Sequence, residues 1–154
     1  MTVTFATEPW NAVKREILPL WQEHWREVSD PDDCERMPLD PDWDKYQALA
    51  DLGMLHITTV RSEGAIVGYA FAVIERGLHY RAVLFGHFDL YWISPAVRGQ
   101  LWLGVRLFRE VERAMITRGV KKMTNRRKLW LDTGAIFRRC GWKDDEIGSS
   151  KWIG

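Results

Sequence analysis

The stretch that decides the fold lies in the middle of the chain and reads YWISPAVRGQLWLG from Tyr91 to Gly104. It starts as a β-rich run, turns at Ser94-Pro95 and continues through Arg98-Gly99 into apolar residues at helical spacing. A strand, a glycine-containing loop and a helix in this order bring unpaired N–H groups and a positive helix end together. Such a junction can bind a phosphate group, although an ordinary strand-to-helix turn has the same pattern.

The residues before this stretch predict two helices and then three strands. Helical spacing joins Trp10, Val13, Ile17, Trp21, Trp25 and Val28, and Pro19 should kink or split that helix. We expect a loop over Ser29–Pro41 and a second helix from Asp40-Pro41 to Gly53. The expected strands are Leu55–Arg61 and Ala65–Glu75, joined as an antiparallel hairpin by Ser62-Glu63-Gly64, and then Tyr80–Phe88 and Asp89–Ile93, which form either one long strand or two segments.

The residues after the stretch predict a helix, a strand, a helix and a last strand. Leu101, Val105, Phe108, Val111 and Met115 fall at helical spacing, and Gly119 ends that helix. The remaining elements are Val120–Thr124 as a strand, Leu131–Cys140 as a helix and Glu146–Ile153 as a strand.

Length and composition point to one soluble domain over residues 1–154. The net charge of +1 argues against a protein that mainly coats nucleic acid, so a nucleic-acid partner is not expected. The four histidines and two cysteines lack metal-ligand spacing, so we expect no metal. No apolar run reaches the roughly 20 residues of a membrane span, and no secretory signal is present, which makes the cytoplasm the expected location.

Two segments resemble the GNAT (GCN5-related N-acetyltransferase) superfamily. Ile93-Ser94-Pro95-Ala96-Val97-Arg98-Gly99-Gln100 is similar to the family's Pro-x-x-Arg-Gly stretch between its fourth strand and third helix. Ala135-Ile136-Phe137-Arg138-Arg139-Cys140-Gly141-Trp142 is similar to its "aliphatic-Tyr-x-x-x-Gly-Phe" ending. His24-Trp25-Arg26-Glu27, Pro41-Asp42-Trp43 and Gly68-Tyr69 look most like small GNAT proteins of tailed phages. The resemblance implies an α/β (α+β) fold, a mixed, mostly antiparallel sheet with helices on both faces.

The resemblance also implies acetyl-CoA as co-substrate and direct attack on its thioester by an amine acceptor. The pantetheine arm would pair with the fourth strand, and the pyrophosphate would lie on the following loop. The residues that this places at the cofactor are Trp92, Ile93, Arg98, Gly99, Gln100, Leu101, Trp102, Leu103 and Gly104.

Two residues depart from the family pattern. Leu101 follows Arg98-Gly99-Gln100 where the family has glycine, and a one-residue insertion would put Gly104 at the final small position. Phe137 stands where many members have the tyrosine that protonates the leaving thiolate.

Candidate catalytic residues lie on the strand before the loop. His87, Asp89 and Tyr91 alternate, so they should share one face of the sheet. Asp89 interrupts an apolar run, which favours either a base or a structural carboxylate, and His87 is either a base or a rim residue. Tyr91 is a candidate proton donor in place of Phe137. The pairs His79-Tyr80 and His24-Trp25 could line the acceptor pocket or simply pack.

The sequence therefore supports an acetyl-CoA-dependent N-acetyltransferase acting on an amine of a small molecule or protein, possible as a homodimer. One alternative is a catalytically inactive GNAT-fold protein, phage-encoded, that binds a host protein or nucleic acid. Another is an enzyme that modifies nucleic acid, for which the basic run Arg118–Lys128 is the support. The same run could instead contact the 3′-phosphate of CoA or be a solvated surface.

Overall fold

The computed structural model describes residues 2–153, with every side chain among them except that of Leu101. One sheet has the strand order β1-β2-β3-β4-β5. Its strands are β1 (Val3–Thr7), β2 (Leu55–Ser62), β3 (Ala65–Gly77), β4 (Tyr80–Ile93) and β5 (Lys122–Thr124). Strands β1 to β4 pair antiparallel, and β5 runs parallel to β4. The predicted mixed, mostly antiparallel sheet is therefore confirmed.

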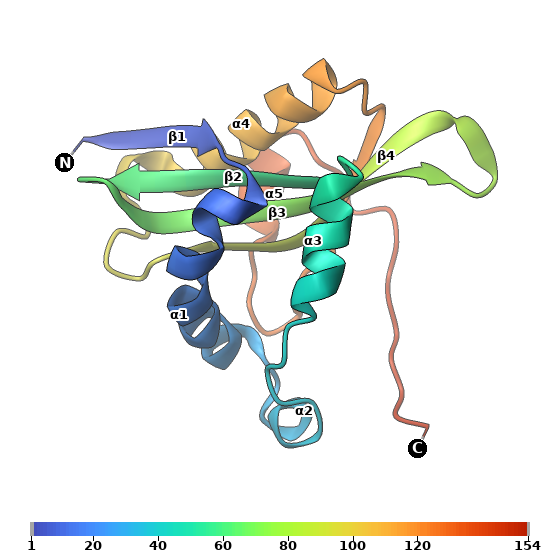
Figure 1. Ribbon diagram of the computed structural model, residues 1–154. Coiled ribbons are helices and arrows are strands. Elements are labelled where there is room, and N and C mark those ends of the chain that lie inside the picture. Colours follow the sequence, from blue (N-terminus) through green and yellow to red (C-terminus); the bar gives the residue numbers. More distant parts are fainter. Residues whose placement is uncertain (1, 154) are drawn as a thin grey trace.

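Helices cover both faces of this sheet, as predicted. They are α1 (Trp10–Val28), α2 (Pro31–Arg36), α3 (Trp43–Asp51), α4 (Leu103–Thr117) and α5 (Gly134–Arg139), with a 3-10 turn, η1 (Gln100–Trp102), before α4. Figure 1 shows α1 and α3 on one face and α4 and α5 on the other. Each face has its own hydrophobic core, one under α1 and one under α4.

Aromatic side chains dominate the core under α1. Trp21 lies between Trp43 of α3, with ring centroids 5.6 Å apart, and Phe71 of β3, also at 5.6 Å. Tyr46 of α3 contacts both Trp21, at 5.1 Å, and Phe71, at 6.2 Å. Aromatic pairs at these separations add to the free energy gained from burial. The stack therefore fixes α1 and α3 against the sheet.

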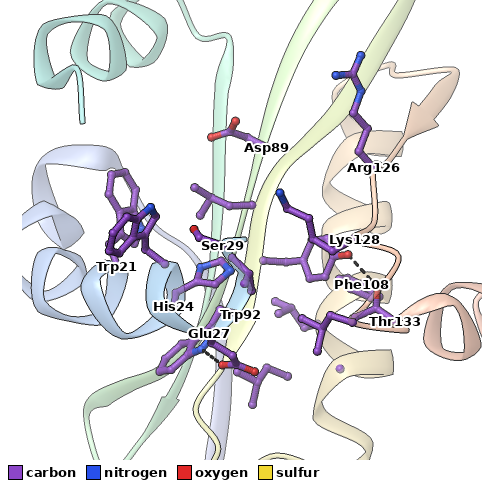
Figure 2. Close-up of a pocket in the computed structure, with 18 of the residues that line it drawn as sticks. Trp21, His24, Glu27, Ser29, Asp89, Trp92, Phe108, Arg126, Lys128 and Thr133 are labelled. Carbon is purple, nitrogen blue, oxygen red and sulfur yellow. Dashed lines mark hydrogen bonds between the residues drawn. The ribbon is translucent and has the colours of Figure 1, made fainter. Parts of the chain in front are cut away.

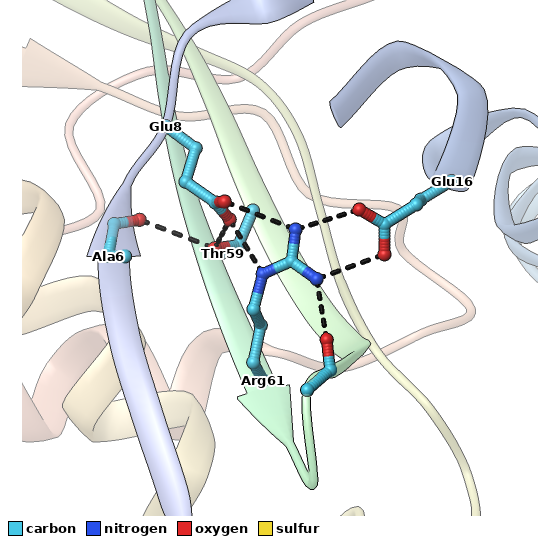
Figure 3. A network of polar contacts seen from close by, with 6 residues as sticks. Ala6, Glu8, Glu16, Thr59 and Arg61 are labelled. Carbon is cyan, nitrogen blue, oxygen red and sulfur yellow. Dashed lines mark hydrogen bonds and ion pairs between the residues drawn. The ribbon is translucent and has the colours of Figure 1, made fainter. Parts of the chain in front are cut away.

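A polar network ties the first half of α1 to the sheet (Figure 3). The Arg61 guanidinium on β2 donates to Glu8 (3.0 and 3.1 Å), to Glu16 of α1 (2.9 Å twice) and to the carbonyl of Gly64 (2.7 Å). The bonds from Arg61 use all five donors of its guanidinium, so Arg61 is fully satisfied where the side chain is only 20% exposed. The Thr59 hydroxyl, which has one proton to donate, lies within hydrogen-bond distance of both Glu8 and the carbonyl of Ala6.

Several predicted boundaries are wrong. The expected loop Ser29–Pro41 contains α2, and Asp30 caps it by accepting from the Asp32 N–H (2.9 Å). The second long helix begins at Trp43 after an Asp42 cap, not at Asp40-Pro41. Strand β1 was not expected, and the expected strand Glu146–Ile153 is extended chain without sheet pairing.

Pro19 neither splits α1 nor ends it, because the helix runs unbroken from Trp10 to Val28. The proline ring is on the exposed side of that helix. Its missing N–H removes one bond of the helix ladder there. The buried residues Trp10, Val13, Ile17 and Trp21 hold the helix on the sheet on both sides of this point.

Asp89 forms a β-bulge in β4 and overturns the predicted alternation. Phe71 on β3 pairs with Leu90, but the next residue, Ala72, pairs with Phe88, so Asp89 has no partner across the ladder. An extra residue of this kind reverses the faces of the residues on its two sides. Tyr91 consequently packs with the core under α4, whereas Leu90 and Trp92 pack with the core under α1. The prediction that His87, Asp89 and Tyr91 share one face is wrong.

Candidate active site

A large cavity opens where β4 and β5 separate. The two strands pair only from Phe85 to His87 on β4, opposite Lys122 to Thr124, and β4 then continues alone to Ile93. A cavity of about 1310 Å³ lies along this free part of β4, lined on one side by α4 and the chain after β5 and on the other by α1, α3 and the connection before α3. Figure 2 shows β4 crossing this cavity, with Trp21, His24 and Glu27 on one side and Phe108, Lys128 and Thr133 on the other.

The loop that follows β4 lines one end of the cavity. Gly99 has a φ of +83°, a conformation that glycine adopts without the steric cost of a Cβ. Trp102 has a φ of +55°, which costs a residue with a side chain about 1–2 kcal/mol. These two turns lead the chain directly into α4, whose first residues, Leu103, Gly104 and Val105, line the cavity. The Leu103 N–H already donates to the Gln100 carbonyl. The other N–H groups in the first turn of a helix lack acceptors within that helix, so they are available to an anion there.

Arg98 holds this loop against α1 instead of pointing freely into the cavity. Its guanidinium donates to Glu27 at the end of α1 (2.5 and 2.8 Å) and to the carbonyl of Ile93 (2.9 and 3.2 Å). Glu27 also accepts from the indole N–H of Trp92 at 3.0 Å. The hydrogen bonds from Arg98 lower the pKa of Glu27 and keep it ionised. We call Glu27, Trp92, Ile93 and Arg98 the loop clamp.

The remaining cofactor candidates differ in their placement. Gln100 is exposed and donates to the Ala96 carbonyl (3.2 Å), outside the cavity lining. The side chain of Leu101 lies outside the described part of the structure. A Cβ on Gly104 would come within 3.3 Å of the Ile136 side chain, so the absence of a side chain there lets α4 and α5 approach closely.

Basic side chains gather on the same side of the cavity. Arg126 and Lys128 belong to the basic run noted in the sequence, and Arg139 lies on α5. The guanidinium of Arg139 lies 4.6 Å from the ring centroid of Trp102. Arg127, between the first two, is paired with Asp144 (2.6 Å) and does not line the cavity. Asp132 also lines this side, so the three cations leave it with a net positive charge.

Asp89 lines the opposite side together with Tyr46. The Tyr46 hydroxyl donates to Oδ2 of Asp89 at 2.9 Å. Burial, reinforced by the Asp89 charge, raises the pKa of Tyr46 far above its usual value, so Tyr46 remains a donor. Among the described residues, Oδ1 of Asp89 has no hydrogen-bond partner, and Asp89 is exposed toward the cavity. The bulge thus presents a fixed carboxylate on β4.

Tyr91 lies beside Phe137, the residue that departs from the family pattern. The two ring centroids are 5.5 Å apart, and Phe137 is stacked on Phe108 at 4.4 Å and only 3% exposed. The Tyr91 hydroxyl is 3.0 Å from the Thr133 hydroxyl, and both residues line the cavity. A phenol is therefore present on this face of the site, but it comes from β4 and not from α5.

His87 does not line the cavity. Its Nδ1 is 2.6 Å from the hydroxyl of Thr124 on β5, and its Nε2 is 3.2 Å from Glu75 on β3. Both ring nitrogens are thus engaged across the sheet where β4 and β5 still pair. His87 therefore lies outside the cavity and contacts Glu75, which does line it.

His24 and Trp25 of α1 line the cavity, whereas His79 and Tyr80 lie at the tip of the β3–β4 hairpin, outside it. His24 Nδ1 shares a hydrogen bond with the buried Tyr69 hydroxyl at 3.0 Å. Burial, with the Arg98 charge, lowers the pKa of His24 to about 4, although Glu27 opposes this shift. His24 is therefore neutral at pH 7. The sequence analysis did not predict Glu27 as a site residue. The available signal was its place in His24-Trp25-Arg26-Glu27, one of the segments that carry the resemblance to GNAT proteins.

Within residues 2–153, no three His, Cys, Asp or Glu side chains lie close enough together to hold a metal ion. None of the helices in this range combines the length and the apolar composition of a membrane span.

Comparison with solved structures returns acetyltransferases over the whole chain. An aminoglycoside acetyltransferase from an uncultured soil metagenomic sample, in complex with sisomicin, superposes with a TM-score of 0.74 at 11% identity, covering 99% of this chain and 97% of its own. Glucosamine-6-phosphate N-acetyltransferase from Arabidopsis thaliana gives 0.74 at 14% identity, with complete coverage of both chains. The chain has the GNAT fold.

A third GNAT-fold structure contains a cofactor analogue. AAC(6')-Iy, in complex with the bisubstrate analogue CoA-S-monomethyl-acetylneamine, gives a TM-score of 0.67 at 14% identity and covers 100% of this chain and 99% of its own. No family model and no curated protein matches the sequence. At these identities the likeness establishes the GNAT fold, and function has to be argued from the site.

Proposed function

We propose that the protein is an acetyl-CoA-dependent N-acetyltransferase that transfers an acetyl group to an amine by direct attack. The observation that carries this proposal is the cavity between β4 and β5, with opposite charges on its two sides. Arg126, Lys128 and Arg139 offer cations to phosphates on one side. Asp89 offers a carboxylate to an ammonium group on the other.

The side chains and backbone present fit acetyl-CoA. The first turn of α4 would receive the pyrophosphate on its free N–H groups, with Arg139 close by. The unpaired part of β4 would receive the pantetheine arm as a missing strand. Since Arg98 already occupies the Ile93 carbonyl, we assign that pairing to the β4 backbone before Ile93. Arg98 itself then acts by holding the loop, not by contacting phosphate.

Asp89 and Tyr91 divide the proton transfers. Most amines are protonated at pH 7, so the acceptor must lose a proton before its nitrogen attacks the thioester carbon. Asp89 holds the ammonium group and accepts that proton, directly or through water, while Tyr46 fixes the carboxylate. When the carbon–sulfur bond breaks, the sulfur leaves as a thiolate and Tyr91 donates its phenolic proton to it. The nitrogen, positively charged after its attack, releases its second proton through water, which restores the Tyr91 phenol and leaves a neutral amide. Thr133 orients the Tyr91 hydroxyl for this step.

The alternative function rests on Phe137. Its ring is fully packed against Phe108 and cannot supply a proton, as expected for a non-catalytic GNAT-fold protein, phage-encoded, that binds a host protein or nucleic acid. The phenol of Tyr91 in the cavity lining favours the enzyme, because it restores a donor on the same face.

Release of the CoA thiol in the presence of amines tests the enzyme proposal. Asp89→Asn should lower kcat at least about 100-fold while the affinity for acetyl-CoA stays within about twofold. Tyr91→Phe should lower kcat about tenfold, because a thiolate is a good leaving group. Asp44→Asn, on the exposed first turn of α3 and outside the cavity lining, is the matched control and should retain wild-type activity. Acetyl-CoA binding without turnover of any amine would favour the non-catalytic alternative.

A further inference from the structure

The acceptor side of the cavity has an apolar wall, of which the proposed reaction uses only the Tyr46 hydroxyl. We define the acceptor wall as Trp25, Leu39, Tyr46, Leu49 and Leu90. These residues come from α1, the α2–α3 connection, α3 and β4, and all are half-buried. Half-buried apolar side chains around a cavity gain free energy when an apolar ligand covers them.

Trp25 shows that the wall is more than the edge of the core. Neighbouring Trp21 is 4% exposed and stacks with other aromatic rings, which explains it as a packing residue. Trp25 belongs to neither hydrophobic core, and among the described residues its ring has no aromatic partner. A half-buried tryptophan that lines a cavity without serving the core is suited to contact a ligand.

Tyr46 joins the apolar wall to the carboxylate. One end of its ring packs on Trp21 and Phe71, and its hydroxyl donates to Asp89. The carboxylate therefore stands directly beside the wall, in a fixed orientation. A molecule with an amine on an apolar body would place its nitrogen at Asp89 and its body against Tyr46 and its neighbours.

The acceptor wall itself offers few hydrogen-bonding groups, namely the Trp25 indole N–H and the Tyr46 hydroxyl, which already donates to Asp89. Charged Asp40, Asp42 and Lys45 also line the cavity, and the neutral polar residues near the wall are Ser29 and His24, which is already bonded to Tyr69. A sugar ring that lay against the acceptor wall would bring several hydroxyl groups into contact with its apolar side chains. Polar groups that lose water without gaining partners reduce affinity.

We propose that the amine acceptor carries its amino group on an apolar, flat body, as an arylalkylamine does, and is not an aminosugar. The inference rests on the proposed function, because it names the acceptor of that same site. It also separates this chain from the GNAT-fold structures named above, whose names or ligands refer to aminoglycosides and glucosamine-6-phosphate. The α-amino group of an N-terminal phenylalanine offers the same chemistry.

Calorimetric titration of the protein with phenethylamine, phenethyl alcohol, sisomicin and glucosamine tests the inference without acetyl transfer. Phenethylamine should bind at least tenfold more tightly than glucosamine or sisomicin. Phenethyl alcohol, which lacks the charge, should bind the wild type more weakly than phenethylamine does. The Asp89→Asn variant should bind phenethyl alcohol and phenethylamine with about equal affinity. Tighter binding of phenylalanyl-glycinamide than of phenethylamine would identify a peptide N-terminus as the source of the amine.

Trp25→Ala is the decisive variant. It should weaken phenethylamine binding at least fivefold and leave the affinity for acetyl-CoA unchanged. Trp130→Ala, which removes an exposed tryptophan outside the cavity lining, should bind phenethylamine as the wild type does. Tighter binding or faster acetylation of sisomicin or glucosamine overturns the inference, as does an absence of phenethylamine binding at millimolar concentration. Failure to bind acetyl-CoA overturns the proposed function instead, and the amine titrations still decide the inference.

Discussion

Two arginines bind α1 to the rest of the fold, but one lies outside the cavity lining and the other inside it. Arg61 bonds to Glu8 and Glu16 near the start of α1, outside the cavity lining. Arg98 bonds to Glu27 at the end of α1, inside it. Arg61 is 20% exposed and satisfies every donor within the fold, whereas Arg98 is 45% exposed and spans from α1 to the loop after β4. The first pair holds the fold, and the second shapes the site.

Removing Arg61 should cause the largest loss of stability. Arg61→Met leaves the carboxylates of Glu8 and Glu16 facing one another without a cation. Because Glu16 is 45% exposed, we expect the free energy of unfolding to fall by about 3 kcal/mol, the low end for buried ion pairs. Urea unfolding measures this. Arg113→Met, which breaks an exposed pair with Glu110, should cost less than about 0.5 kcal/mol. The affinity of Arg61→Met for acetyl-CoA should match the wild type, and a large loss of affinity would break the distinction between the two arginines.

Acidification should destabilise the protein through buried histidines. Burial lowers the pKa of His24, beside the loop clamp, and of His56 to about 4 each. The unfolded chain binds these protons near pH 6.5, so the free energy of unfolding should fall between pH 6.5 and pH 4, by up to about 3 kcal/mol for each group.

Urea unfolding at several pH values, on the wild type and on His24→Gln, measures the share of His24. That variant should lose roughly half of the pH dependence in this interval. His79→Gln, at the exposed hairpin tip, should keep the wild-type slope. An unchanged slope in His24→Gln would show that His24 is not held neutral by burial.

Opening the loop clamp should affect binding more than stability. Glu27→Gln removes the charge that Arg98 and Trp92 share, so the loop should lose its fixed position before α4. We expect acetyl-CoA affinity to fall about tenfold, equivalent to about 1.4 kcal/mol, in a calorimetric titration. Glu110→Gln, whose carboxylate meets only the exposed Arg113 among the described ion pairs, is the matched control. A stability loss as large as that of Arg61→Met, with wild-type affinity, would reverse the assigned roles.

The smallest effects should come from backbone conformation in the same loop. Gly99→Ala forces a Cβ into a left-handed conformation and should cost about 1 kcal/mol of stability. Trp102→Gly relieves the same kind of strain and should change stability by less, in the opposite direction. Thermal unfolding resolves both. Equal effects of the same sign would contradict the left-handed conformation of Trp102.

Sequence patterns predicted the helices and strands correctly where the hydrophobic spacing is strong. They failed for elements that depend on pairing with a distant part of the chain. The spacing in α1 and α4 predicted both helices, and the Thr- and Val-rich runs predicted β2 and β3. Strand β1 is too short to show a pattern and depends on β2 for its pairing. Asp30-Pro31 carries the same cap-and-proline signal as Asp40-Pro41, but only the first pair starts a helix.

The placement of the predicted cofactor residues was foreseen in part, and their role at a cofactor stays a prediction. The predicted residues that line the cavity, where the chain passes from β4 into α4, are Trp92, Ile93, Arg98, Gly99, Trp102, Leu103 and Gly104, whereas Gln100 lies outside it. Sequence alternation could not reveal the bulge at Asp89, since an unpaired residue is visible only against the neighbouring strand. It also could not reveal that Arg98 is bound by a glutamate 71 residues away.

The most direct test of the account is a calorimetric titration of the purified protein with acetyl-CoA, preceded by a check for CoA that co-purifies. The account predicts one site per chain with a dissociation constant in the micromolar range, weakened by Glu27→Gln and unchanged in Arg61→Met. Absence of binding at millimolar acetyl-CoA would contradict it, because the cavity between β4 and β5 would then have another ligand.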